Sequence, residues 1–155
     1  MGDRLAGKVA VVTGGGRGIG KAIALAYAGE GADICLVART AEQIDEVATE
    51  IQTIGRKVLA VPTDVTDRDQ VETTASRVRE SFGKIDILVN NAGGGIERNL
   101  VLESDPELWI KDVNTNLISV YLMTHALLPL MIESGGGHII STGSGMGHIS
   151  GPKGS

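Results

Sequence analysis

The chain has 155 residues, the length of one average domain, and its 14 basic and 19 acidic side chains give a formal net charge of −5. A negative charge without a basic run excludes a nucleic-acid surface and an anionic-membrane surface, and each apolar stretch is too short to span a bilayer. Cys35 is the single cysteine, which excludes an internal disulfide framework and a thiolate zinc site. The single cysteine, together with the absence of an apolar leader at the N-terminus, favours a cytoplasmic protein.

Short apolar strands alternate with amphipathic helices along the sequence. The expected strands cover residues 8–13, 32–38, 57–61, 85–89 and 138–142. The expected helices cover residues 18–28, 40–54 and 67–82, with two further helical stretches between 105 and 133. A glycine-rich loop is predicted over residues 90–99, and residues 143–155 have no helical pattern. This alternation predicts a parallel sheet covered on both faces.

The helices also carry signals for their ends and for the side that faces the sheet. Gly29, Gly55 and Gly83 stand where the first three helices stop, as expected for C-caps. Asp67 is a suitable N-cap for the third helix. The apolar positions of the first helix, which we expect to face the sheet, are Ile19, Ile23, Ala26 and Tyr27.

The order of the expected elements also predicts the topology. Right-handed crossovers put the first two helices on one face of the sheet and the later helices on the other. The natural strand order is 3-2-1-4-5, a doubly wound α/β fold with a ligand crevice between the first and fourth strands. No linker or charge block divides the chain, so residues 1–155 are expected to form a single domain.

A glycine-rich turn joins the first strand to the first helix, with the sequence Thr-Gly-Gly-Gly-Arg-Gly-Ile-Gly over residues 13–20. Glycines let the backbone approach a pyrophosphate, and the helix N-terminus offers it free N–H groups. A tight turn without a ligand is the alternative, but the strand–helix context favours a dinucleotide-binding domain. The residues expected at the cofactor are Gly14, Gly16, Gly18, Ile19 and Gly20.

Two arginines at the predicted crevice favour NADP over NAD. Arg17 places a cation in the first turn of a helix, where it opposes the helix dipole by ~0.3–1 kcal/mol unless a phosphate binds there. Arg39 follows the second strand, where an NAD-specific site usually carries an acidic residue for the ribose hydroxyls. Each arginine alone is typical of a solvated surface, but together they indicate a 2′-phosphate site.

Two further turns follow expected strands and therefore lie at the crevice. Asp64 and Val65 follow the third strand and are expected at the adenine ring, with an ordinary turn as the alternative. Residues 90–93, Asn-Asn-Ala-Gly, follow the fourth strand and suit the nicotinamide side better than a plain turn. The residues expected there are Asn90, Ala92 and Gly93.

These motifs resemble those of the short-chain dehydrogenase/reductase family across nearly the whole chain. They are joined by Asn116-Leu117 and by residues 137–144, Gly-His-Ile-Ile-Ser-Thr-Gly-Ser, a stretch also similar to 3-oxoacyl-carrier-protein reductases. The resemblance implies a Rossmann-like fold and an NADP-dependent oxidoreductase. Its reaction would be hydride transfer between the nicotinamide and a carbonyl or secondary-alcohol substrate. The resemblance also implies a homodimer or homotetramer.

The same resemblance implies two catalytic residues. Ser144 would hydrogen-bond the substrate carbonyl; the alternative is a loop hydroxyl without a role. Asn116 would interrupt its helix and hold a water of the proton relay, with Asn114 as a competitor for this role and a plain polar residue on a helix flank as the alternative. The histidines have no partner at metal-ligand spacing, so no metal site is predicted.

The general acid is the one departure from the family pattern. The family's Tyr, with a Lys four residues later, lies beyond the serine, but no Tyr follows Ser144 in this sequence. Tyr27 and Tyr121 belong to helices that precede it. We therefore expect a chain truncated after the fifth strand and inactive by itself. The alternatives are a non-catalytic dinucleotide-binding module and an inactive fragment.

Overall fold

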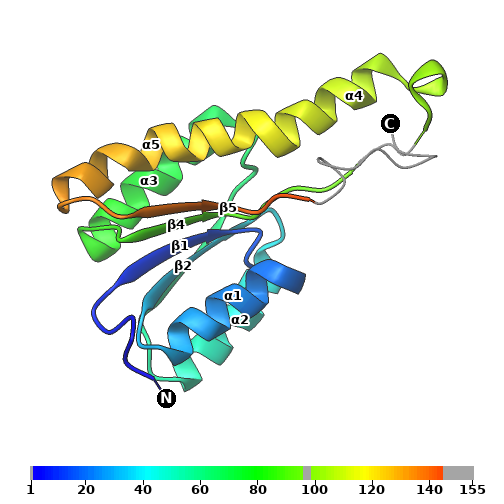
Figure 1. Ribbon diagram of the computed structural model, residues 1–155. Helices are drawn as coiled ribbons and strands as arrows, with labels where there is room; N and C mark the ends of the chain where they lie inside the picture. The colour runs from blue at the N-terminus through cyan, green and yellow to red at the C-terminus, as the bar shows by residue number, and fades with distance from the viewer. Residues whose placement is uncertain (1, 96–98, 145–155) are drawn as a thin grey trace.

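The computed structural model of the protein describes residues 2–95 and 99–144 (Figure 1). The strands are β1 (Val9–Thr13), β2 (Asp33–Ala38), β3 (Val58–Pro62), β4 (Ile87–Asn90) and β5 (His138–Ser141). The α-helices are α1 (Gly18–Gly29), α2 (Ala41–Thr53), α3 (Arg68–Phe82), α4 (Pro106–Val113) and α5 (Ser119–Glu133). The 3-10 helix η1 (Val101–Glu103) precedes α4, and the π-helical segment η2 (Asn114–Ile118) joins α4 to α5.

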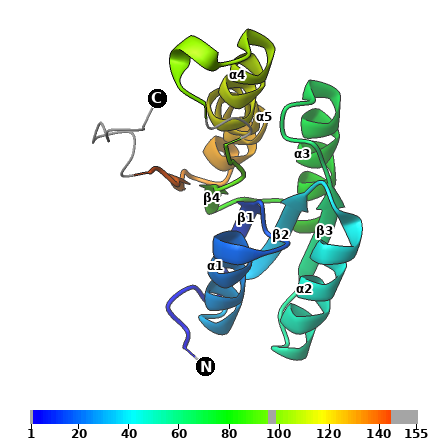
Figure 2. The same ribbon diagram turned by 90° about the vertical axis from the view of Figure 1, so that its right-hand side faces the viewer.

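The five strands form a parallel sheet in the order β3-β2-β1-β4-β5, which confirms the predicted topology. β1 is central and all five of its residues are buried, as expected for an apolar strand covered on both faces. β5 forms one edge of the described sheet, and its four residues are exposed. α1 and α2 cover one face, while α3 and α5 cover the other (Figure 1 and Figure 2). The carboxyl ends of β1 and β4 therefore lie side by side where the strand order reverses.

Alternate residues of β1 point into two separate cores. Ala10 and Val12 pack in the core that includes α1 and α2, whereas Val11 packs in the core that includes α3 and α5. The largest buried side chains are Ile34, Leu36, Ile44 and Ile51 in the first core and Ile85, Leu88, Met123, Leu127 and Met131 in the second. Each contributes ~1.5–3 kcal/mol by burial, so the two cores fix the strand ends that carry the site.

The face that α1 turns to the sheet differs from the prediction. Ile19 is 64% exposed, Ala26 is exposed, and Ile23 and Tyr27 are only partly buried against the core. The buried residues of α1 are the small ones, Gly20, Ala24 and Ala28. Small residues four positions apart let a helix approach a sheet closely. This close approach, and not the burial of the bulkier apolar side chains, sets the orientation of α1.

α4, η2 and α5 run on as one continuous helix, Pro106–Glu133 (Figure 1). With 28 residues, it is long and apolar enough to cross a membrane, by length and composition alone. The prediction that every apolar stretch is too short was therefore wrong, because it measured runs between polar residues and not the whole helix. In the fold, the inner side of α5 packs in the second core through Met123, Leu127 and Met131.

Cys35 offers a direct test of the packing of β2. Its side chain is fully buried, and this burial raises the pKa of the thiol to about 12. We therefore expect a thiol reagent near neutral pH to label the native protein very slowly. Labelling should become fast in denaturant, because an exposed cysteine has a pKa of ~8.5. Rapid stoichiometric labelling of the native protein would contradict this packing.

Candidate functional site

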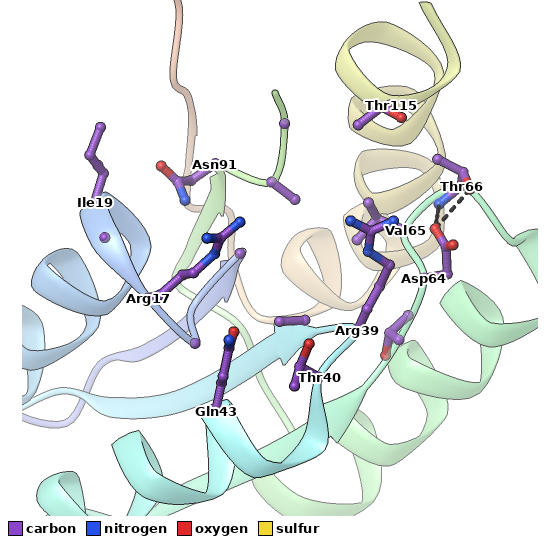
Figure 3. A pocket seen from close by; sticks show the side chains of 17 residues that line it. Arg17, Ile19, Arg39, Thr40, Gln43, Asp64, Val65, Thr66, Asn91 and Thr115 are labelled. Carbon is purple, nitrogen blue, oxygen red and sulfur yellow. Dashed lines mark hydrogen bonds between the residues drawn. The ribbon is translucent and has the colours of Figure 1, made fainter. Parts of the chain in front are cut away.

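A cavity of about 490 Å³ opens at the carboxyl edge of the sheet, where the strand order reverses (Figure 3). Its walls come from the turns after β1 and β2, the β3–α3 connection, the loop after β4, and η2. The lining residues are Gly14, Gly16, Arg17, Gly18, Ile19, Ala38, Arg39, Thr40, Gln43, Thr63, Asp64, Val65, Thr66, Asn91, Ala92, Gly93 and Thr115. The cavity thus brings together the residues predicted to bind a cofactor, except Gly20 and Asn90.

The turn between β1 and α1 depends on glycine. Gly14 and Gly18 have φ angles of +66° and +56°, in the left-handed region that favours glycine. Gly20 lies behind the turn, and a Cβ there would stand 2.2 Å from the Gly14 carbonyl oxygen. The turn therefore folds directly onto the first residues of α1 and presents its backbone to the cavity.

Gly20→Ala is expected to destabilise the protein by ~1–3 kcal/mol, because the added methyl group collides with the backbone of the turn. Gly29→Ala is the matched control on the same helix, since a Cβ at that position meets no atom within 4 Å. Because alanine has the higher helix propensity, the control should be neutral or slightly stabilising. Urea unfolding followed by circular dichroism measures both variants. Equal free energies of unfolding would contradict the close packing of turn and helix.

The N-terminus of α1 is suited to bind an anion. Arg17 is its N-cap residue, the side chain of Arg17 makes no capping hydrogen bond, and the first turn contains no acidic residue. By contrast, the carboxylates of Asp67 and Asp105 cap α3 and α4. The first-turn N–H groups of α1 and the positive end of its dipole therefore remain available at the cavity.

Arg17 and Arg39 extend their guanidinium groups into the cavity (Figure 3). Among the residues that the structure describes, neither has an ion-pair partner, whereas seven other basic side chains pair with carboxylates. Asp64 is the one carboxylate among the lining residues, and its Oδ1 accepts hydrogen bonds from Thr66 N at 3.0 Å and Thr66 Oγ1 at 2.7 Å. Two such cations beside an uncapped helix end favour a phosphate.

Thr13 and Asn91 connect the ends of three strands beneath the cavity. The Thr13 hydroxyl accepts hydrogen bonds from Asn91 N and Ala92 N, both at 2.9 Å, and donates to Val89 O at 3.3 Å. Asn91 Nδ2 donates to Thr13 O at 3.1 Å, and Asn91 Oδ1 accepts from Thr142 Oγ1 at 3.2 Å. This network fixes the loop after β4 against the glycine-rich turn.

Asn90 and Asn91 occupy different environments. Asn90, predicted on the nicotinamide side, is 4% exposed and outside the cavity lining, and its Nδ2 donates to Thr124 Oγ1 of α5 at 3.2 Å. Asn91 lines the cavity together with Ala92 and Gly93. The period-two alternation of strand side chains is the signal that separates the two asparagines once the end of β4 is known.

Asn116 connects η2 to the loop after β4. Its Oδ1 accepts from Gly94 N at 3.0 Å, while its Nδ2 donates to Gly94 O and to Asp112 O, both at 2.9 Å. The α-helical pattern is interrupted at Asn116, as predicted, because η2 is π-helical. Asn114 begins this segment, and Thr115, which carries no sequence signal of its own, lines the cavity.

Ser144 follows β5 and is exposed, outside the cavity lining. The chain before it is held at the same edge of the sheet, since Thr142 N donates to Asn90 O at 2.9 Å. Tyr27 and Tyr121, on α1 and α5, also lie outside the lining. Residues 145–155 lie outside the described part of the chain.

The sequence matches a known family over most of its length. The model of that family, described as short chain dehydrogenase, matches residues 8–155. An uncharacterized oxidoreductase of Mycobacterium tuberculosis is 42% identical over 147 residues, which cover 94% of this chain and 56% of that protein. A 3-oxoacyl-[acyl-carrier-protein] reductase of Thermotoga maritima is 37% identical over 150 residues, covering 96% of this chain and 60% of that protein.

Solved structures with the same fold agree with these relatives. L-Sorbose reductase from Gluconobacter frateurii, in complex with NADPH and L-sorbose, has a TM-score of 0.89 at 39% identity. The match covers 94% of this chain and 56% of the reductase chain. A 7α-hydroxysteroid dehydrogenase, complexed with NADH and 7-oxo glycochenodeoxycholic acid, has a TM-score of 0.91 at 32% identity. The match covers 97% of this chain and 58% of the dehydrogenase chain. The chain therefore spans less than two thirds of the length of these proteins.

Proposed function

This chain belongs to the short-chain dehydrogenase family of oxidoreductases, and from this membership we propose that it binds NADP(H). The proposed reaction of the protein is hydride transfer between the nicotinamide and a carbonyl or secondary alcohol of a small molecule. One observation carries the proposal: Arg17 and Arg39, without ion-pair partners among the described residues, share a cavity with the uncapped N-terminus of α1.

The residues of the cavity fit each part of such a dinucleotide. The N–H groups of α1 would bind the pyrophosphate, and Arg17 and Arg39 would hold the 2′-phosphate. Asp64 and Val65 would contact the adenine, while Ala92 and the loop around it would face the nicotinamide. Because one related structure contains NADPH and another NADH, the preference for NADP rests on the two arginines.

Ser144 is the proposed catalytic residue, and Asn116 is the proposed positioning residue of the proton relay. When bound, the cofactor supplies or accepts the hydride. The hydroxyl of Ser144 would donate a hydrogen bond to the substrate carbonyl and so polarise it. The side chain of Asn116 is already bonded to Gly94 and Asp112, so its contribution would be to hold the loop and η2 in place. A π-helical segment shifts the hydrogen-bond register, and a main-chain carbonyl of η2 could then hold the water of a proton relay.

Titration calorimetry with NADPH and NADH tests the proposal. The 155-residue chain should bind NADPH at least tenfold more tightly than NADH but reduce ketones little or not at all, because no Tyr follows Ser144 to act as general acid. A protein of its relatives' full length should reduce a panel of ketones with oxidation of NADPH. Absence of binding by both cofactors would overturn the dinucleotide site. Binding without turnover in the protein of full length would favour the second candidate, a non-catalytic dinucleotide-binding module, which is supported by the position of both tyrosines outside the cavity lining.

The outer side of the long helix supports self-association. Leu117, Tyr121, Leu128 and Ile132 follow one another at intervals of four and seven residues and are 63%, 61%, 38% and 66% exposed. Exposed apolar side chains on one helical side are typical of a protein–protein interface. We propose that this side forms the contact of a homodimer or homotetramer in the cytoplasm, a state that light scattering of the purified protein measures.

A further inference from the structure

We propose that Gln70 is a positioning residue that holds the Asp64–Val65 wall of the cavity in place for the adenine half of the cofactor. This inference rests on the proposed cofactor function. Gln70 lies in the first turn of α3 and does not line the cavity itself. It acts through the connection between β3 and α3, which forms the wall on the right in Figure 3.

The side chain of Gln70 bridges the wall and the helix with both ends of its amide. Its Oε1 accepts the main-chain N–H of Asp64 at 2.8 Å, and its Nε2 donates to Asp67 Oδ2 at 2.8 Å. A main-chain N–H can only donate and a carboxylate can only accept, so these two partners fix the orientation of the amide. The bridge therefore sets the position of the Asp64 backbone relative to α3.

The helix end that supports this bridge is well anchored. Asp67 Oδ1 accepts the N–H groups of Asp69 at 3.0 Å and Gln70 at 3.1 Å, which caps α3. The main-chain and then the side-chain hydrogen bond from Gln70 lower the pKa of the Asp67 carboxyl, so it remains an acceptor at neutral pH. Asp67 N also donates to Asp64 O at 3.0 Å.

A second connection runs from Gln70 to the cavity through buried hydroxyl groups. The Thr74 hydroxyl donates to Gln70 O at 2.9 Å and lies 2.8 Å from Thr63 Oγ1. Thr63 lines the cavity, and Thr63 and Thr74 are 2% and 0% exposed. Gln70 thus contacts the wall at Asp64 through its side chain and at Thr63 through its carbonyl and Thr74.

The wall is ordered internally without Gln70. Asp64 Oδ1 accepts both hydrogen bonds from Thr66, so the shape of the connection itself is set locally. What Gln70 adds is the placement of this connection relative to α3 and β3. Loss of the bridge should therefore displace the adenine-binding wall and leave the glycine-rich turn and the two arginines unchanged.

A charge swap between positions 70 and 67 tests the bridge. Gln70→Glu places a carboxylate oxygen against the Asp67 carboxylate, which repels it and opens the bridge. Adding Asp67→Asn restores a donor opposite the new carboxylate, and asparagine remains a good N-cap. Gln52→Glu, at an exposed position of α2, is the matched control. Gln70→Met, of similar length without hydrogen-bonding groups, serves if the charged variant does not fold.

Each variant is made in the full chain and characterised by two measurements, ligand affinity and amide hydrogen exchange. Calorimetry with adenosine 2′,5′-bisphosphate, the adenine half of NADP, should show binding about five- to tenfold weaker for Gln70→Glu, as expected for the loss of one hydrogen bond. The double variant should recover the affinity. Amide hydrogen exchange by NMR should show faster exchange at Asp64 in the single variant, while Val71, inside α3, exchanges as before.

The outcomes separate this inference from the function on which it rests. If the unaltered protein binds neither NADPH nor the bisphosphate, the proposed function fails, and the inference with it. If the unaltered protein binds both and Gln70→Glu binds equally well, only the inference is overturned. A general loss of thermal stability without faster exchange at Asp64, or a double variant that does not recover, also overturns it.

Discussion

Arg39→Asp is expected to reverse the cofactor preference, weakening NADPH binding about ten- to a hundredfold while NADH binds at least as well as before. The substitution removes a charge-assisted hydrogen bond of ~1.5–3 kcal/mol and places a carboxylate where the 2′-phosphate would lie. The same carboxylate can accept hydrogen bonds from the ribose hydroxyls of NADH. Arg39 has no carboxylate partner within the described chain, so the change leaves no protein charge unpaired.

Calorimetric titration of both cofactors gives the ratio of their dissociation constants for each variant. Lys111→Asp, an exposed position on α4 outside the cavity, makes the same change of charge and should leave that ratio as it is. A ratio that stays constant in Arg39→Asp would show that the arginine is a solvated surface residue. The pairing of Arg17 and Arg39 as a phosphate site would then be wrong.

In a protein of its relatives' full length, Ser144→Ala is expected to lower turnover about a hundredfold or more and to leave the affinity for NADPH unchanged. A single hydrogen-bond donor to a reacting carbonyl has an effect of this size, because it stabilises charge that develops only in the transition state. The pyrophosphate and the 2′-phosphate would lie at the glycine-rich turn and the arginines, away from Ser144. Steady-state kinetics with a ketone substrate, together with cofactor titration, separates the two effects.

Ser144→Thr and Ser141→Ala complete this experiment. Threonine keeps the hydroxyl group and should retain much of the turnover. Ser141 pairs with Asn90 in the sheet and has no role in the proposed chemistry, so its replacement should leave turnover close to that of the unaltered protein. A loss in Ser141→Ala with normal turnover in Ser144→Ala would move the carbonyl-binding role to Ser141.

The sheet could be predicted from the sequence because local signals repeat along it. The first four strands are mostly apolar and the first three helices end at a glycine or within two residues of one, so the order β3-β2-β1-β4-β5 needed only the rule of right-handed crossovers. The inward side of α1 could not be predicted in the same way. Hydrophobic periodicity favoured Ile19, but the approach of Gly20 to the Gly14 carbonyl is a contact between backbone atoms and leaves no apolar signal.

Single-residue positions at the site depend on contacts that are distant in sequence. Asn90 and Asn91 exchange sides if the pairing register of β4 is shifted by one residue, because strand side chains alternate. The role of Gln70 depends on where the β3–α3 connection passes α3. The residues around Gln70 are those of any polar helix end, so the sequence does not single it out. The interruption at Asn116 was available only from the resemblance, since the partner of its side chain, Gly94, is 22 residues away.

The hydrogen bonds of the Thr13 hydroxyl can form only after segments distant in sequence have come together. This hydroxyl joins β1 to residues 78 and 79 positions later, so the site cannot form before the chain has closed a long loop and β4 has docked on β1. A dinucleotide would then bind only the completed fold and would draw the folding equilibrium toward it by mass action. At a hundred times its dissociation constant, a ligand of this kind raises the free energy of unfolding by about 2.7 kcal/mol. The cofactor would therefore act as the last structural element of the protein to be added.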